Sequence, residues 1–149
     1  MADPRAPASP PDVILHASCV AIAGRGLLIA GASGRGKSAL ALQMMALGAE
    51  LVSDDRVMLH RAGDAILASA PPAITGLIEA RGLGLLQTQP AGPTPVFALL
   101  DLDRDEPDRL PQPRQSDLLG RSVTLLYRVD APHFPAALVH YLRTGQRTI

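Results

Sequence analysis

The sequence has little of several residue types, and each shortage excludes a class of protein. Its single cysteine, Cys19, rules out an internal disulfide and fits a reducing cytosol. There is no tryptophan, and with only two phenylalanines and two tyrosines the core must be mainly aliphatic. No apolar run approaches the ~18 residues that cross a membrane, and residues 1–11 lack the apolar segment of a signal peptide. We therefore expect a cytoplasmic protein.

Net charge is also lacking, since 14 basic residues balance 14 acidic ones. Nucleic acids and anionic membrane surfaces attract proteins with a basic excess, so we expect neither as a partner. The length of 149 residues fits one domain. We expect residues 1–12, which include four prolines, to form a disordered N-terminal arm, and residues 13–149 to form a single domain.

Lysine is the scarcest basic residue, and its one copy, Lys37, lies in a motif. The other thirteen basic residues are arginines. Residues 31–38 match G-x-x-x-x-G-K-S/T, the phosphate-binding loop of nucleotide-binding proteins. A compact ammonium reaches the β- and γ-phosphates inside such a loop, whereas a planar guanidinium would collide with it. The residues expected to bind the triphosphate are Gly31, Ala32, Ser33, Gly34, Arg35, Gly36, Lys37 and Ser38.

The elements around this loop predict an α/β domain with many strands and few helices. Apolar segments predict strands at 13–22 and 27–30, joined as a hairpin by the glycines between them. The next element is a helix from about 37 to 47, with Leu40, Met44 and Leu47 on one buried face. The remaining expected elements are a strand at 50–53, a hairpin of 57–60 with 65–68, strands at 96–102 and 122–129, and a helix at 135–143. The expected loops are 70–95, with a short helical or extended piece near 74–86, and 104–116, which we expect to be mobile.

Three further segments carry candidate catalytic or metal-binding groups. Asp54 and Asp55 end a strand at the sheet edge where the phosphate loop emerges, so either could hold a metal ion or accept a proton; a solvated turn is the alternative. His16 is expected in mid-strand, where a histidine is usually structural unless an acid lies beside it. Glu79 could complete a Mg²⁺ shell and Arg81 could stabilise a transferring phosphoryl group, although a plain surface loop is the alternative for both.

Together these segments resemble the catalytic domain of the bacterial HPr kinase/phosphorylase family. That family has a histidine before the loop, a G-x-S-G-x-G-K-S loop, a hydrophobic strand closed by Asp-Asp, and an E-x-R-G-L-G signature. The corresponding segments here are His16, 31–38, 51–55 and 79–84, in the same order and at matching spacing. The resemblance covers roughly residues 13–86. It implies a β-rich P-loop kinase core of the type that HPr kinase shares with phosphoenolpyruvate carboxykinase.

The resemblance also implies an activity. It predicts an ATP-dependent protein serine kinase that uses Mg²⁺ and phosphorylates HPr, or an HPr-like phosphocarrier of a regulatory phosphotransferase system. In the family the second aspartate accepts the proton of the target serine, which implies that role for Asp55 with His16 as its partner. With the reasoning from the residues themselves, the expected catalytic groups are Asp55, His16, Lys37 and Arg81, and the expected Mg²⁺ ligands are Ser38, Glu79 and Asp54.

The sequence departs from the family pattern at two places. Ala39 follows the loop where the family usually has glutamate, and the family's downstream basic loop has no clear copy, leaving Arg114 and Arg121 as candidates for its arginine. We therefore expect phosphorolysis to be residual or absent. Family members form hexamers, and a homo-oligomer is a possible assembly here. Two other functions stay open, a P-loop kinase for a small molecule and a non-catalytic ATP-binding sensor.

Overall fold

The structure, a computed structural model, describes residues 11–148. The expected disordered arm at 1–12 lies almost wholly outside this range. The strands in it are β1 (Val13–Leu15), β2 (Ser18–Ile22), β3 (Arg25–Ala30), β4 (Glu50–Ser53), β5 (Val57–Ala62), β6 (Ala65–Ser69), β7 (Leu77–Ala80), β8 (Gly84–Gln87), β9 (Thr94–Asp105), β10 (Arg114–Leu118) and β11 (Arg121–Arg128). The helices are α1 (Lys37–Ala46) and α2 (Phe134–Thr144), with a 3₁₀ turn at Pro72–Ile74.

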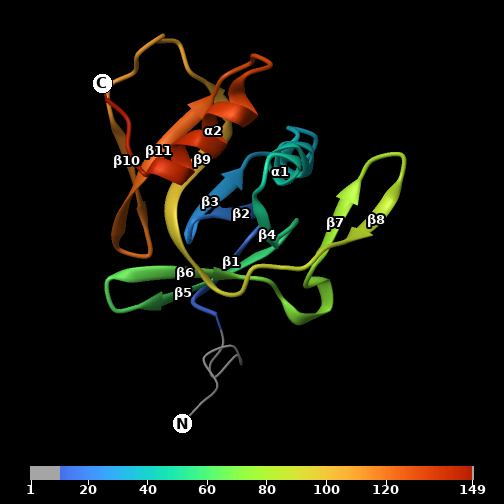
Figure 1. The fold of residues 1–149 in the computed structure, drawn as a ribbon. Helices are drawn as coiled ribbons and strands as arrows, with labels where there is room; N and C mark the ends of the chain where they lie inside the picture. The colour runs from blue at the N-terminus through green and yellow to red at the C-terminus, as the bar shows by residue number, and fades with distance from the viewer. Residues whose placement is uncertain (1–10, 149) are drawn as a thin grey trace.

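The long strand β9 lies at the centre of the main sheet (Figure 1). It pairs in parallel with β3 on one side and with β11 on the other, so that Leu99 lies opposite both Leu28 and Leu125. Antiparallel β2 and β4 continue the sheet beyond β3, and β10 continues it beyond β11. The first residues of β9 pair instead with β6, which brings β5 and β1 into the same sheet. One strand thus joins the two parts of the sheet.

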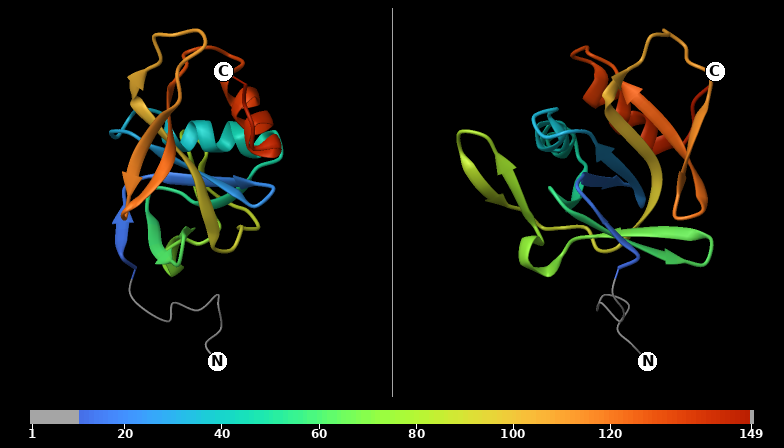
Figure 2. Two further views of the ribbon diagram at one scale, coloured as in Figure 1. Left: turned by 90° about the vertical axis from the view of Figure 1, so that its left-hand side faces the viewer. Right: turned by 180° about the vertical axis from the view of Figure 1, so that it is seen from behind.

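Successive side chains of the central strands pack on opposite faces, which gives the sheet a core on each side. Leu27 points to the face covered by α1 and α2, while Leu28 points to the face covered by β5 and β6. In β4, Leu51 likewise points to the helix-covered face and Val52 to the face covered by β5 and β6. Figure 2 shows the two helices together on one side of the sheet. All four side chains are fully buried, so both faces are packed.

Helix α1 begins where the phosphate loop ends, as the sequence predicts. The residue before it, Gly36, has φ 92°, a left-handed conformation that glycine adopts without strain. Leu40 and Met44 are buried against the sheet. The expectation that Leu47 joins this face is wrong: the helix ends at Ala46, and Leu47 is exposed because the chain turns there towards β4.

The strand expected at 13–22 divides into two. β1 pairs with β5, whereas β2 pairs with β3 and β4, so the chain passes from one part of the sheet to the other between them. His16 lies at this break rather than in mid-strand, and its side chain is exposed. The predicted hairpin of the second strand with the phosphate-loop strand is confirmed as β2–β3, with its turn at Ala23 and Gly24.

Two segments that the sequence predicted as loops contain strands in the structure. The segment near 74–86 is extended and forms the β7–β8 hairpin, which projects from the body of the molecule beside α1 (Figures 1 and 2). The prediction of a mobile loop at 104–116 is wrong at both ends, because β9 continues to Asp105 and β10 begins at Arg114. Cross-strand charge pairs extend β9: the Arg128 guanidinium on β11 lies 3.0 Å from the Asp105 carboxylate.

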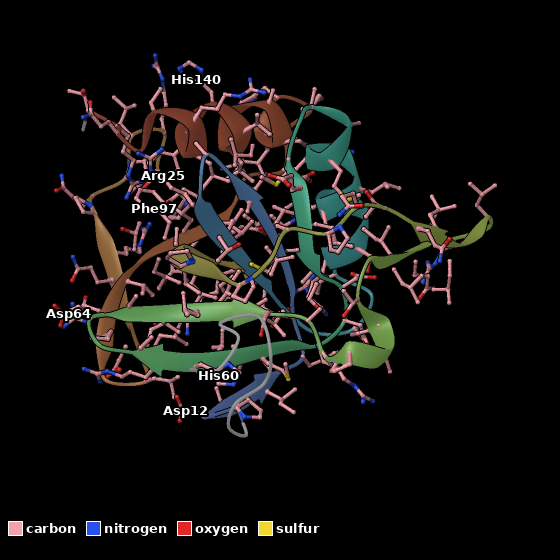
Figure 3. All side chains as sticks on the ribbon, turned by 60° about the horizontal axis from the view of Figure 1, so that its bottom comes forward. Asp12, Arg25, His60, Asp64, Phe97 and His140 are labelled. Carbon is pink, nitrogen blue, oxygen red and sulfur yellow. The ribbon has the colours of Figure 1, made fainter. Side chains whose placement is uncertain are left out.

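Helix α2, predicted at 135–143, is held against the sheet by Arg25. Its guanidinium donates to the carbonyl oxygens of Leu142 at 2.9 Å and Arg143 at 3.1 Å, which lie at the end of the helix. The same guanidinium lies 5.6 Å from the ring centre of Phe97, and Figure 3 labels the two side chains beneath α2. Within residues 11–148, neither helix has the length and apolar character that a membrane span requires.

Candidate functional site

One cleft of about 530 Å³ brings most of the predicted site residues together. It opens between the phosphate loop, the turn after β4 and the end of β7. The predicted catalytic residues that line it are His16, Lys37, Asp55 and Arg81. The other predicted residues on its wall are Ser33, Gly34, Gly36, Ser38 and Glu79. Segments that are far apart in the sequence therefore supply carboxylates, a cation and a hydroxyl to one space.

The phosphate loop is wrapped around its own lysine. Lys37 is only 8% exposed, and its Nζ donates to the carbonyl oxygens of Gly31 at 2.7 Å and Ala32 at 3.2 Å. Gly31 has φ 148°, and a Cβ added there would lie 3.1 Å from the Cβ of Leu102. The first glycine of the motif thus allows the loop to pass close to β9, and the ammonium lies inside the loop.

Asp54 links four segments through its buried carboxylate. The residue is 5% exposed, and its Oδ1 accepts hydrogen bonds from the hydroxyls of Ser18 and Ser38, both at 2.7 Å. Its Oδ2 accepts from the backbone N–H of Glu79 at 3.1 Å. Sequence reasoning missed Ser18, since a serine at the start of an apolar strand carries no motif. The carboxylate holds the last residue of the phosphate loop against β2, β4 and β7.

Asp55 turns the opposite way and faces the cleft. Its Oδ1 lies 2.8 Å from Nε2 of His16, and the two side chains are 62% and 55% exposed. The backbone of Asp55 has φ 72°, a left-handed conformation that costs a non-glycine residue roughly 1 kcal/mol. This conformation lets two adjacent aspartates point in different directions, one to the interior and one to the cleft.

The oxygen donors near Ser38 fit a magnesium ion that is shared with phosphates. The Ser38 hydroxyl and the buried Asp54 carboxylate are in contact, and Glu79 extends into the same cleft. Between residues 11 and 148 there is no group of three or more His, Cys, Asp or Glu side chains that could hold a metal by themselves. Mg²⁺ usually binds one or two carboxylates together with phosphate oxygens and water, which is what this set offers.

The two candidates for a downstream catalytic arginine lie elsewhere. Arg114 makes a two-pronged ion pair with the largely buried Glu106, and its guanidinium lies 4.3 Å from the ring centre of Tyr127. Arg121 lies 3.6 Å from Asp64 at the tip of the β5–β6 hairpin. Neither arginine lines the cleft, and each is paired with an acid outside it.

Asp103 is a site residue that the sequence did not reveal. The sequence predicted that the strand ends at residue 102, but Asp103 lies on β9 and its carboxylate accepts from the Ala32 N–H at 3.0 and 3.2 Å. It also accepts from Arg35 Nε at 3.1 Å. The Ala32 N–H, followed by Arg35, holds the pKa of Asp103 below its usual value. The alternation of Asp101, buried Leu102 and Asp103 was the available signal for a strand.

The lowered pKa predicts an acid-sensitive contact between β9 and the phosphate loop. A carboxylate whose pKa is lower in the folded state stabilises the fold at pH values above its ordinary pKa, and this contribution is lost as pH falls through its folded pKa. We expect the free energy of unfolding to fall more steeply from about pH 5 to pH 3 in the wild type than in Asp103→Asn. Urea unfolding followed by circular dichroism measures both slopes, with Asp64→Asn as the control; equal slopes would contradict the assignment.

The comparisons with known proteins agree with this geometry. A family model, the HPr serine kinase C-terminal domain, matches residues 9–91. The chain is 47% identical to the HPr kinase/phosphorylase of Cupriavidus necator, over 52% of this chain and 24% of that protein. It is 31% identical to the HPr kinase/phosphorylase of Lacticaseibacillus casei, over 85% of this chain and 48% of that protein. The chain therefore spans about a quarter to a half of these relatives.

A solved structure extends the likeness to the fold. The HPr(Ser) kinase/phosphatase from Coxiella burnetii superposes with a TM-score of 0.75 over 90% of this chain and 90% of that chain, at 22% identity. A match over 90% of the chain must include most of the segment from β9 to α2, which lies beyond the residues that the family model covers. This confirms the predicted fold class, a β-rich α/β kinase core with few helices.

Proposed function

The chain belongs to the family of HPr serine kinase C-terminal domains, and from this premise we propose that it is an ATP-dependent protein serine kinase. Its substrate would be HPr or an HPr-like phosphocarrier of a regulatory phosphotransferase system. Residues 13–149 would form the single catalytic domain, for which a homo-oligomer is a possible assembly. The protein would act in the cytoplasm, with neither nucleic acid nor a membrane as a partner. The free thiol of Cys19 is buried, which is compatible with a reducing compartment.

The observation that carries the proposal is the position of the His16–Asp55 pair. Its carboxylate shares a cleft of about 530 Å³ with Lys37 and the phosphate loop. A base on one wall and a triphosphate site on the other leave space between them for a hydroxyl group. Phosphoryl transfer depends mainly on positioning and charge stabilisation, and these groups supply both.

The side chains of this site account for each step of the proposed phosphoryl transfer. Oδ1 of Asp55 contacts His16, so Oδ2, which lies 4.0 Å from Nε of the exposed Arg56, is the oxygen that would take the proton of the incoming serine. The serine oxygen forms a bond to the γ-phosphorus while the bond to the β–γ bridging oxygen breaks, and ADP leaves. Lys37 stabilises the charge on the β- and γ-phosphates, and Arg81 faces the same space from β7–β8. Mg²⁺ bound at Ser38, with Asp54 and Glu79 nearby, would neutralise phosphate charge.

Phosphorolysis, the reverse use of the same site, has weaker support. The arginines expected from the family's downstream basic loop do not line the cleft, and Ala39 offers no carboxylate after the loop. We propose that kinase activity predominates. Inorganic phosphate added to phosphorylated HPr would measure phosphorolysis directly, because its attack on the phosphoserine releases the serine and forms pyrophosphate.

The decisive experiment is incubation of the purified chain with ATP, Mg²⁺ and the HPr-like protein of the same organism. We expect one phosphoryl group on the substrate, located on a serine by mass spectrometry, and none without the chain. An HPr variant with that serine changed to alanine is the matched control. ATP binding without any transfer to HPr would instead indicate a nucleotide sensor.

A further inference from the structure

A second cleft, of about 400 Å³, lies next to the first. Its walls are the first turns of α1, the start of α2 and the segment between β11 and α2, with Leu102 of β9 among them. The residues that line both clefts are Gly36, Ala39 and Gln43. The end of the phosphate loop and the first turns of α1 therefore separate the two spaces, and a ligand on the loop can reach both.

The sheet places the second cleft on the side of the loop away from the catalytic aspartates. β3, which leads into the loop, is flanked by β2 and β4 on one side and by parallel β9 and β11 on the other. Asp54 and Asp55 follow β4. Leu102 and Val129, which line the second cleft, lie near the carboxyl ends of β9 and β11. Ligands of parallel sheets bind at this edge, so both clefts open where ligands are expected.

The charges of the two clefts differ. In the first, the Lys37 ammonium is hydrogen-bonded to uncharged carbonyl groups and remains available to an anion. In the second, Arg128 lies 3.0 Å from the Asp105 carboxylate and 3.2 Å from that of Asp130. Arg35 is likewise paired with Asp103 at 3.1 Å. The cations of the second cleft are thus already balanced, which favours an uncharged ligand group over a phosphate.

The surface of the second cleft suits a flat heterocycle. Leu40 and Leu102 are buried, and Phe134 at the start of α2 supplies a partly buried ring. At the rim, the exposed Asp130 carboxylate offers hydrogen-bond acceptors to an amino or hydroxyl group. The cleft has both apolar and polar walls, and its size falls in the range of ~300–1,000 Å³ typical of small-molecule sites.

From these observations we infer that the second cleft binds the nucleoside part of the nucleoside triphosphate, with the base against Phe134 and Leu102. The triphosphate then runs over the loop so that its γ-phosphate enters the first cleft beside Lys37 and Asp55. This inference rests on the proposed function, because it assumes that the loop binds a nucleotide. It adds which side of the loop the base occupies, and it leaves the part of the first cleft beyond the γ-phosphate open to the protein substrate.

A bulky residue in the second cleft tests the inference. Ala131→Trp fills the space between the β11–α2 segment and α1, and Ala62→Trp places the same residue on the exposed tip of the β5–β6 hairpin as a control. Calorimetry measures the binding of Mg²⁺ with ATP and of Mg²⁺ with inorganic tripolyphosphate. We expect Ala131→Trp to weaken ATP binding at least about tenfold and to change tripolyphosphate binding less than about twofold. Ala62→Trp leaves both unchanged.

A second variant does not depend on blocking the cleft. The chain contains no tryptophan, so Phe134→Trp introduces a single indole at the cleft wall. We expect its fluorescence to change on addition of ATP and to stay constant with tripolyphosphate. An equal response to the two ligands would show that the indole reports on the loop alone.

Each outcome decides between the two proposals. Unchanged ATP binding by Ala131→Trp, or equal loss of both ligands, overturns the base site while the loop still binds nucleotide in the wild type. If circular dichroism shows that Ala131→Trp is unfolded, the fluorescence of Phe134→Trp decides the question. If the wild type binds neither ATP nor tripolyphosphate, the proposed function itself fails, and the base site fails with it.

Discussion

Replacing Lys37 with alanine is expected to abolish phosphoryl transfer to the HPr-like substrate. The ammonium lies inside the phosphate loop, with its Nζ 2.7 Å from the Gly31 carbonyl oxygen, and no other lysine exists in the chain. Removing a charged group that stabilises the transferring phosphates costs on the order of 10²–10³-fold in rate, or more where binding also falls. The rate is measured from the phosphoserine formed per minute at saturating ATP.

The matched variant is Lys37→Arg, which keeps the charge and changes only its shape. Because Lys37 is 8% exposed and enclosed by the loop backbone, a planar guanidinium has little room there. We expect Lys37→Arg to lose nearly as much activity as Lys37→Ala. Wild-type turnover by Lys37→Arg would show that charge alone suffices, and would remove our explanation for the single lysine. Thermal unfolding of both variants checks that the fold persists.

Replacing Asp55 with asparagine is expected to stop transfer while ATP still binds. Asparagine has the same shape and tolerates a left-handed backbone such as φ 72°, so the turn after β4 is retained. It cannot accept the serine proton as a carboxylate does, and loss of a general base typically lowers the rate by ~10²–10⁴-fold. Phosphoserine formation measures transfer, and calorimetry with ATP measures binding, which we expect to stay within about twofold of the wild type.

Two comparisons make the Asp55 result specific. Asp64→Asn removes a carboxylate from the exposed tip of the β5–β6 hairpin, labelled in Figure 3, and should leave the rate unchanged. His16→Gln keeps a hydrogen-bonding group near Oδ1 of Asp55, so a smaller loss than that of Asp55→Asn is expected. If Asp55→Asn transfers phosphate at the wild-type rate, another group must accept the proton.

The local patterns of the sequence predicted those parts of the fold that depend on neighbouring residues. The β3–loop–α1 unit was predictable because an apolar strand, closely spaced glycines and an amphipathic helix follow one another directly. The hairpins β2–β3 and β5–β6 were predictable for the same reason, since their strands pair across short turns. The cleft around Lys37 was predicted through family resemblance, which supplied the relation between His16 and Asp55 that spacing alone does not give.

What the sequence did not reveal depends on contacts between distant segments. Asp103 binds the loop only because β9 pairs in parallel with β3, across about 70 residues of sequence. Its charged neighbours made the segment look like a solvated loop, whereas ion pairs between β9 and β11 keep it extended. The break at His16 was hidden because β1 and β2 are both apolar, and only their different partners divide them.

The left-handed backbone at Asp55 makes the proposed catalytic base a source of local strain in the fold. Glycine would adopt φ 72° without steric cost, so Asp55→Gly would relieve roughly 1 kcal/mol of local strain, partly offset by a more disordered unfolded chain. Directed evolution for heat resistance alone would therefore tend to replace this aspartate, and on the proposed mechanism the resulting variants would be inactive. A library screened for both traits should keep Asp55 and find its stabilising changes elsewhere.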